Sequence, residues 1–185
     1  YRSFMVAAGA EQGVALNSPV LGQLGDRLVA IGLIVEVRPK TAIVLLLTDE
    51  LSSAAAFLTS ASSVTAMGET PSSYDGLLQG QGDARLRINY LSPDAQINVG
   101  DLVYTSPTSV TFPPDILIGK VVKVHPLDPF LTYQSVEVQS ALEASRVKEV
   151  MILKQATGTA ERLAETARAA MGGEAPIEDE EGKQP

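Results

Sequence analysis

The feature that most restricts the fold of this chain is a series of short apolar runs between residue 3 and about residue 155. Gly, Pro, Asn, Asp or Ser interrupts these runs every eight to twelve residues or so. Runs of this length match β-strands, whereas amphipathic helices need longer segments with a period of about 3.6 residues. Turn signals at this spacing are typical of a sandwich or barrel. We therefore predict an all-β fold.

The clearest predicted strand covers residues 85–90, where three apolar side chains alternate with three polar ones. The apolar set is Leu86, Ile88 and Tyr90, and the polar set is Arg85, Arg87 and Asn89. Because successive side chains of a strand point to opposite faces, this pattern predicts one buried and one solvated face. Seven further strands are predicted at residues 4–8, 27–37, 42–47, 102–105, 116–124, 135–139 and 150–153.

The stretch from Ser52 to Tyr74 has a different composition from the strands around it. It is rich in Ser, Ala and Thr and contains Gly68 and Pro71. Such a stretch fits either a poorly patterned pair of strands or a mobile connection. We place a domain junction near Gly68.

The pattern changes near the C-terminus, where we expect residues 156–185 to form a marginal helix and a disordered acidic tail. Thr159 is a suitable N-cap and residues 160–170 are good helix formers, but only Leu163 and Met171 are large apolar anchors. The acidic residues that follow stand among Gly and Pro with almost nothing to bury. They are Glu174, Glu178, Asp179, Glu180 and Glu181.

Composition and charge exclude several classes of function. The 185 residues are 45% hydrophobic, enough for a packed core, but the net charge of -8 offers no basic field for nucleic acid. The absence of cysteine removes disulfides, thiolate catalysis and cysteine-ligated metals. The longest apolar runs, such as residues 42–47, are far shorter than the roughly 20 residues of a membrane-spanning helix. Since Tyr1-Arg2-Ser3-Phe4 is not the start of a signal peptide, we expect the chain to begin inside a longer natural protein.

Known catalytic patterns are not found in the sequence. His125 is the only histidine, it lies in a Val-His-Pro segment, and no Gly-x-Ser-x-Gly elbow occurs, so we interpret it as a turn or surface residue. One histidine without cysteine provides too few ligands for a tetrahedral zinc site. We therefore expect no catalytic residue, no metal and no cofactor.

Carboxylates and glycines also have structural explanations. The candidates for a catalytic carboxylate pair, all in the ordered region, are Asp83, Asp94, Asp101, Asp115 and Asp128. Those in turn contexts are expected to cap or close turns instead. Gly80-Gln81-Gly82 lacks the third glycine and the helix of a nucleotide-binding loop. We interpret this segment as a hairpin.

Most aromatic residues are expected in the core, with three exceptions. Phe112, Phe130 and Tyr133 stand next to Pro or Thr residues in predicted loops. Exposed rings at such positions are typical of a protein interface. We therefore predict these three residues as protein-interaction sites.

The order of motifs from Gly80 to Val124 resembles the most characteristic block of the rod shape-determining protein MreC family. The block reads Leu-Arg-Ile-Asn-Tyr-Leu at 86–91, Val-Gly-Asp-Leu-Val-Tyr-Thr-Ser at 99–106, Phe-Pro at 112–113 and Ile-Gly-Lys-Val at 118–121. The resemblance covers residues 3–154. Its structural-motif residues in this chain are Gly80, Gly100, Asp101, Thr105, Ser106, Phe112, Pro113 and Gly119. Pro107 and Pro114-Asp115 stand where the family usually has Gly, and Pro cannot adopt a positive φ there.

The resemblance implies a pair of small six-stranded β-barrels, similar to the halves of a chymotrypsin-like fold without its catalytic residues. On this basis residues 1–67 are expected to form the first barrel, truncated at its N-terminus. Residues 68–155 are expected to form the second barrel, with late strands able to return to the first.

The resemblance also implies a non-catalytic scaffold of cell-wall elongation, located in the periplasm and anchored to the cytoplasmic membrane by a helix that is missing from this chain. The implied partners are a second copy of the chain, the elongation-specific class B penicillin-binding protein, and MreD with the actin-like MreB filament. Two alternatives come from other classes. One is a protease or wall hydrolase built around His125 and a serine such as Ser106, and the other is a glycan-binding β-domain, disfavoured because the chain has no Trp.

Overall fold

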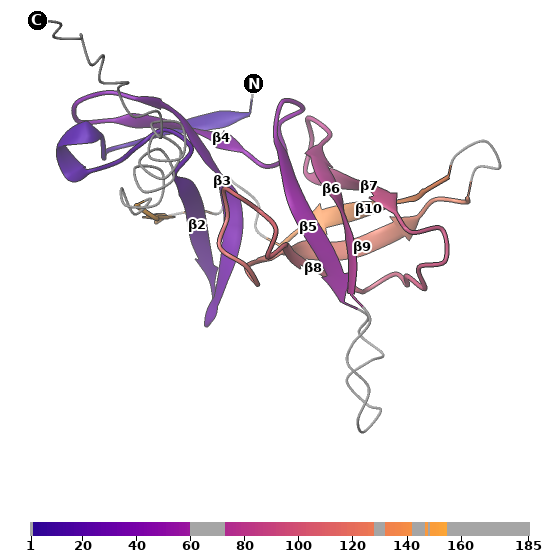
Figure 1. Ribbon diagram of the computed structural model, residues 1–185. Coiled ribbons are helices and arrows are strands. Elements are labelled where there is room, and N and C mark those ends of the chain that lie inside the picture. The colour runs from indigo at the N-terminus through magenta and orange to yellow at the C-terminus, as the bar shows by residue number, and fades with distance from the viewer. Residues whose placement is uncertain (1, 60–72, 128–131, 142–146, 148, 155–185) are drawn as a thin grey trace, which may run out of the picture. The chain divides into compact units, whose positions relative to one another are not determined.

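The computed structural model describes residues 2–59, 73–127, 132–141, 147 and 149–154 (Figure 1). These residues belong to one compact unit that runs from Tyr1 to Lys154. Its elements are β1 (Ser3–Val6), a 3-10 turn (Ala10–Gln12), β2 (Pro19–Leu24), β3 (Arg27–Val37), β4 (Ala42–Leu46), β5 (Ser53–Thr59), β6 (Ser73–Gly80), β7 (Arg85–Leu91), β8 (Leu102–Thr105), β9 (Leu117–Val124), β10 (Gln134–Ser140) and β11 (Met151–Ile152). The predicted all-β class is confirmed.

Six strands close into a β-barrel. The antiparallel pairings run β5-β6-β7-β10-β9-β8, and β8 pairs with β5 to complete the circle. The strands β5 to β10 lie together in Figure 1. Closure leaves no free backbone edge among these six strands.

Alternation along the strands fills the barrel with apolar side chains. On β5 the inward positions are Ala54, Ala56 and Leu58, and the residues between them are more exposed. The small alanines share the interior with larger buried side chains, which are Leu78, Leu86, Ile88, Val103, Ile118, Val121, Val136 and Val138. Each fully buried Leu, Ile or Val contributes about 1.5–3 kcal/mol relative to an exposed one. The barrel interior is thus a packed core.

The other strands form an open run with a core of its own. They pair in the order β1-β4-β3-β2-β11, and their buried cluster is Val14, Val20, Ile34, Ala42 and Val44. Among the described residues, no pairing joins β1 to β11. The second six-stranded barrel and the chymotrypsin-like arrangement are therefore not confirmed. One parallel bridge, Val29 to Leu117, joins β3 to β9.

The predicted domain boundaries stay a prediction. The junction near Gly68 lies outside the described residues, as do the predicted helix and acidic tail at 156–185. The strand before that junction, β5, pairs with β6 and β8, and the late strand β11 pairs with β2. Strands from before residue 68 therefore pair with strands from after it, both in the closed barrel and in the open run of strands.

The ends of the eight predicted strands agree with the observed ones to within two residues. Three observed strands, β2, β5 and β6, are not among those eight. The sequence does not predict β2, because Pro19-Val20-Leu21-Gly22-Gln23-Leu24 lacks clear alternation. The strand β5 lies inside the Ser, Ala and Thr-rich stretch, and β6 begins in its last two residues, Ser73 and Tyr74. Residues 60–72 of that stretch lie outside the described residues.

Candidate interaction surfaces

The Gly100-Asp101 turn directs the chain into β8. Gly100 has a φ of 103°, which favours glycine, and its N–H donates to the Val121 carbonyl at 2.8 Å. The buried Asp101 accepts the Asn98 N–H through Oδ2 at 2.8 Å. In the turn before β7, Asp83 Oδ1 accepts the Arg85 N–H at 2.6 Å. Both carboxylates organise local backbone, which is the role expected of an Asp in a turn.

The buried hydroxyls of Thr105 and Ser106 hold the loop that follows β8. Thr105 Oγ1 donates to the Pro113 carbonyl at 2.6 Å and accepts the Ile116 N–H at 2.9 Å. Ser106 Oγ donates to Asp75 Oδ1 at 3.0 Å. The positive φ of this loop falls on Asp115, at 62°, directly after the proline that cannot adopt it.

Phe112 is buried, with 3% of its surface exposed, and packs into the barrel core. The exposed ring that the sequence predicts here is therefore not what the structure shows, because Phe112 is buried. The cause is the loop itself, because the hydrogen bond of Thr105 to the neighbouring Pro113 turns the segment inward. Phe112 is a core residue supplied by a loop.

Two glycines of the motif block lie against backbone atoms. A Cβ on Gly119 would stand 2.1 Å from the Gln139 carbonyl oxygen, across the β9–β10 pair. A Cβ on Gly80 would stand 2.0 Å from the carbonyl oxygen of Asp49. Since real Cβ contacts are much longer and backbone cannot move aside, both positions require glycine.

In the part of the chain that the structure describes, the recorded neighbour of His125 is a carboxylate and not a hydroxyl. Its Nε2 lies 3.0 Å from Glu137 Oε1, although the N–H direction does not meet the angle of a hydrogen bond. Ser106, the serine considered for a hydrolase, bonds to Asp75 and Thr108 instead. A base that activates a serine must lie within hydrogen-bond reach of its hydroxyl. His125 and Ser106 therefore do not form a nucleophile and base pair in this structure.

Glu137 on β10 is the centre of a charged cluster that spans three strands. Arg85 Nη1 lies 2.9 Å from Oε2, and Lys123 Nζ lies 3.6 Å from Oε1, the same oxygen that faces His125. Partial burial acts to raise the pKa of Glu137, but the Arg85 hydrogen bond and the charges of Lys123, His125 and Arg85 outweigh it. The net result is a lowered pKa, so Glu137 stays ionised to a lower pH than an ordinary glutamate.

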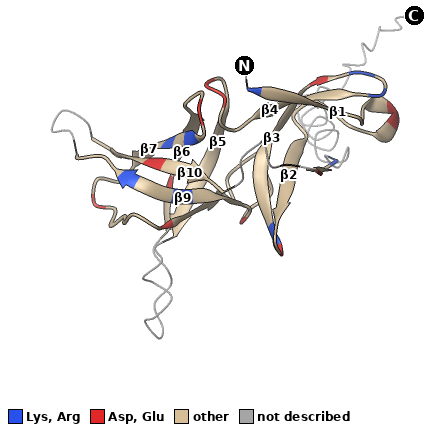
Figure 2. Ribbon diagram, turned by 180° about the vertical axis from the view of Figure 1, so that it is seen from behind, with Lys and Arg blue, Asp and Glu red and all other residues tan. Residues whose placement is uncertain are grey.

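Cross-strand pairing extends this cluster into a basic face. We define the basic face as Arg85, Arg87, Lys120 and Lys123, which surround Glu137. Arg87 and Lys123 pair directly with Glu137 in the sheet, and Gln139, between Arg85 and Lys120, continues the same side of β10. Figure 2 shows the cationic segments of β7 and β9 beside the acidic segment of β10.

Replacing Glu137 with Gln is expected to lower the free energy of unfolding by about 1 kcal/mol at neutral pH, because the charge contacts with Arg85 and Lys123 are lost. The folded-state pKa lies below the unfolded one, so this stabilisation is present above the unfolded value of 4.5 and is lost as the pH falls through the folded value. Urea unfolding at pH 7 and at about pH 3 measures the difference, which should become smaller at the lower pH. The control is Glu36→Gln, whose carboxylate forms an exposed pair with Arg38.

A pair of tyrosines lies outside the barrel core. Tyr90, which the alternation predicts as buried, is 62% exposed, and Leu91 takes the buried position instead. The reason is a φ of 64° at Tyr90, opposite a register shift between Gln134 and Val136 on β10. The Tyr90 and Tyr133 rings have centroids 4.8 Å apart and planes tilted by 51°.

Of the three predicted interaction residues, only Tyr133 keeps a surface position in the described structure. It is half-buried, while Phe112 is in the core. Phe130 and Asp128 lie outside the described residues. The ring of Tyr133 packs against Tyr90, which is exposed although the alternation of residues 85–90 predicts it to be buried.

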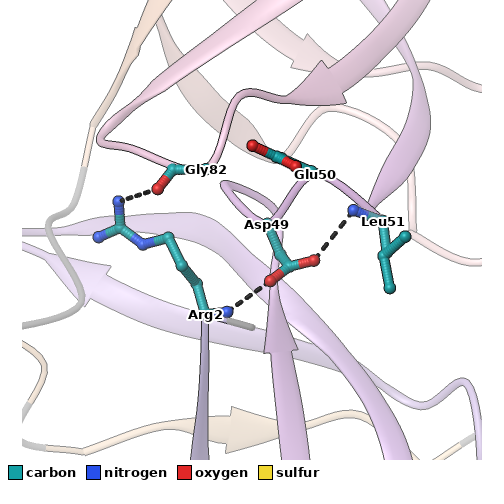
Figure 3. Close-up of a pocket in the computed structure, with 5 residues that line it drawn as sticks. All are labelled: Arg2, Asp49, Glu50, Leu51 and Gly82. Carbon is teal, nitrogen blue, oxygen red and sulfur yellow. Dashed lines mark hydrogen bonds between the residues drawn. The ribbon is translucent and has the colours of Figure 1, made fainter.

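A shallow polar pocket of about 390 Å³ lies where the chain enters β1 (Figure 3). Asp49 accepts the backbone N–H of Arg2 and, at 2.9 Å, that of Leu51. These two hydrogen bonds, Arg2 first, lower the pKa of Asp49 despite its burial. The Arg2 guanidinium approaches the Gly82 carbonyl at 3.5 Å. Asp49 thus holds the start of β1, and its oxygens are already occupied.

Metal-binding clusters and membrane-spanning helices are both missing from the described ranges. No group of three or more His, Cys, Asp or Glu side chains there is placed to hold a metal ion. No helix in those ranges combines the length and hydropathy needed to span a membrane.

Comparison with protein families decides the family of this chain. The model for "Rod shape-determining protein MreC, barrel core" matches residues 1–154. The chain belongs to the MreC family. This confirms the resemblance of the motif block, and it covers the whole compact unit described above. No curated protein sequence matches significantly.

Solved structures share the MreC fold with this chain. The crystal structure of MreC from Pseudomonas aeruginosa is 27% identical, with a TM-score of 0.66 over 82% of this chain and 88% of that one. The major periplasmic domain of "the cell shape-determining filament MreC" is 23% identical, with a TM-score of 0.58 over 76% and 78%. MreC in a complex with penicillin-binding protein PBP2 from Helicobacter pylori is 19% identical, with a TM-score of 0.54 over 80% and 92%. The last two show likeness of fold alone.

Proposed function

We propose that this chain is a non-catalytic scaffold of the cell-elongation machinery, which maintains rod shape by binding the elongation-specific peptidoglycan transpeptidase, a class B penicillin-binding protein. The observation that carries the proposal is membership of the MreC family across residues 1–154. The polar side chains of the motif block also fit a scaffold, since Thr105, Ser106 and Asp101 are used to hold loops and turns.

Similar proteins support the proposed partners. An MreC of the same fold forms a complex with penicillin-binding protein PBP2 in Helicobacter pylori. Another is named a filament and a periplasmic domain, which supports self-association and an extracytoplasmic location for this chain. Membrane attachment through a helix outside this sequence and contact with MreD complete the proposal.

The tyrosine pair is the proposed contact with the transpeptidase. Exposed aromatic rings that pack on each other present a large apolar area and lose little side-chain freedom on binding. Tyr90 also holds a positive φ, a conformation that is costly for a non-glycine residue and is often kept at functional sites.

Replacing Tyr90 and Tyr133 together with Ala is expected to weaken transpeptidase binding at least about tenfold, the effect of losing one hot-spot cluster. Titration of the labelled periplasmic part of the cognate transpeptidase, read by fluorescence anisotropy, measures this effect. The control is Leu51→Ala, which removes a 68% exposed apolar side chain elsewhere on the unit.

Two outcomes would contradict different parts of this proposal. Unchanged affinity of the double variant would show that the tyrosine pair is not the contact. If the unsubstituted chain did not bind the transpeptidase, the scaffold function itself would be wrong.

A further inference from the structure

The basic face concentrates positive charge on a chain whose net charge is -8. Four cationic side chains, Arg85, Arg87, Lys120 and Lys123, share one side of β7, β10 and β9. Arg85 and Lys123 are more than half exposed, with fractions of 55% and 58%. Glu137 neutralises one charge, and the Asp83 carboxylate lies at the backbone of Arg85. A net positive patch remains on this face.

The charges of this face are not fully used within the described structure. Arg87 Nε is shielded from solvent and has no hydrogen-bond partner among the described residues. Lys120 is exposed and makes no ion pair there. A carboxylate from outside the barrel would give the exposed Lys120 ammonium a partner, and the Arg side chains of this face suit carboxylates because their donors form a planar fork.

The same chain contains a segment of opposite charge. Residues 174–181 carry five carboxylates in eight positions, and Lys183 is the only cation after them. Every copy of the chain therefore brings both a basic face and an acidic segment. Contacts of one copy's segment with the next copy's face use two different surfaces, so they repeat from molecule to molecule instead of ending at a dimer.

We propose that the basic face is the docking surface for the acidic segment 174–181 of a second copy of this chain. Charge complementarity between the four cations and the five carboxylates carries the inference. The inference rests on the proposed self-association and names its contact. Because the paired charges lie at an exposed surface, the contact is weak and sensitive to salt.

Two complementary full-length variants test the contact directly. The acceptor, labelled with ¹⁵N, carries Glu178→Gln, Asp179→Asn, Glu180→Gln and Glu181→Gln, so it has only the basic face. The unlabelled donor carries Lys120→Gln and Lys123→Gln, so its face is weakened and its acidic segment is intact. Adding donor to acceptor is expected to shift the amide signals of Arg85, Arg87, Lys120 and Lys123. Raising NaCl from about 50 to about 300 mM should weaken the interaction at least about tenfold.

Matched controls isolate the charges. An acceptor that also carries Arg27→Gln and Lys40→Gln loses two exposed cations far from the basic face in sequence and should bind the donor as well as before. A second acceptor carries Lys120→Gln and Lys123→Gln in place of those two substitutions. Its affinity for the donor should fall at least about fivefold, since it lacks two of the four cations of the basic face. A donor whose segment is neutralised should cause no shifts.

Each contrary result has a defined meaning. The proposal is overturned if the acceptor signals stay unchanged, or if the neutralised donor shifts them equally. It is also overturned if the acceptor signals shift by an amount that does not depend on the donor concentration. Sedimentation distinguishes failure of this contact from failure of the proposed self-association. If the variant with the neutralised segment still self-associates, self-association stands and the contact is elsewhere. If the unsubstituted chain is a monomer, the proposed self-association is itself contradicted.

Discussion

Replacing Phe112 with Ala is expected to lower the free energy of unfolding by about 4 kcal/mol, the effect of removing a fully packed aromatic ring from a core. Phe112 is only 3% exposed and belongs to the same cluster as the strands of the closed barrel. Thr105 holds the residues after the ring, at Pro113 and at Ile116, and the Phe112 N–H donates to Ser109 Oγ at 3.1 Å before it. These hydrogen bonds keep the backbone from collapsing into the space left by the ring. Urea denaturation followed by circular dichroism measures the loss.

The control for this prediction lies in the same loop. Val110 is 95% exposed, and Val110→Ala should change the stability by less than about 0.5 kcal/mol. If Phe112→Ala were as stable as Val110→Ala, the ring would not be part of the core. The interface role predicted from the sequence would then return to consideration.

Replacing Gly119 with Ala is expected to destabilise the chain by about 3 kcal/mol, at the upper end of the cost of overpacking. The new methyl group would stand 2.1 Å from the Gln139 carbonyl oxygen and 3.1 Å from a Val138 methyl. Relief requires separating β9 from β10, which would weaken a pairing that closes the barrel. Thermal unfolding of the two proteins gives the difference.

Gly25→Ala is the matched control for this steric effect. Gly25 has a φ of 60° and nothing within 4 Å of an added Cβ, so the substitution meets conformational strain without a clash. A cost of about 1 kcal/mol is expected. Equal losses at the two positions would mean that close approach at Gly119 is relieved without opening the sheet.

Much of the fold was readable from local patterns. The alternation of apolar and polar residues at 85–90 requires a strand with one buried face, and β7 begins at Arg85 as predicted. Apolar runs at 27–37 and 102–105 coincide with β3 and β8. The ordered motif block indicates the MreC family from sequence alone, because several short motifs at fixed spacing are far more specific than any one of them.

The candidate site was less readable, because its residues are brought together by pairing between distant strands. Glu137 meets Arg85 across 52 positions of sequence, and no local pattern marks that contact. Ala54 and Ala56 carry a weak strand signal, yet they are buried because five neighbouring strands complete the barrel around them. Strand propensity describes packing on a sheet more than a property of the residue itself.

The sequence by itself determined the period of the strands, the positions of many turns, the exclusion of disulfides and the family. Tertiary structure alone decided which side chains face outward wherever the regular alternation fails. At Tyr90 a positive φ opposite a register shift turns a predicted core ring to the surface, and at Phe112 a hydrogen-bonded loop carries a predicted surface ring into the core. The physical reason is that a one-residue irregularity reverses the face of a side chain, and such irregularities are set by the partner strand.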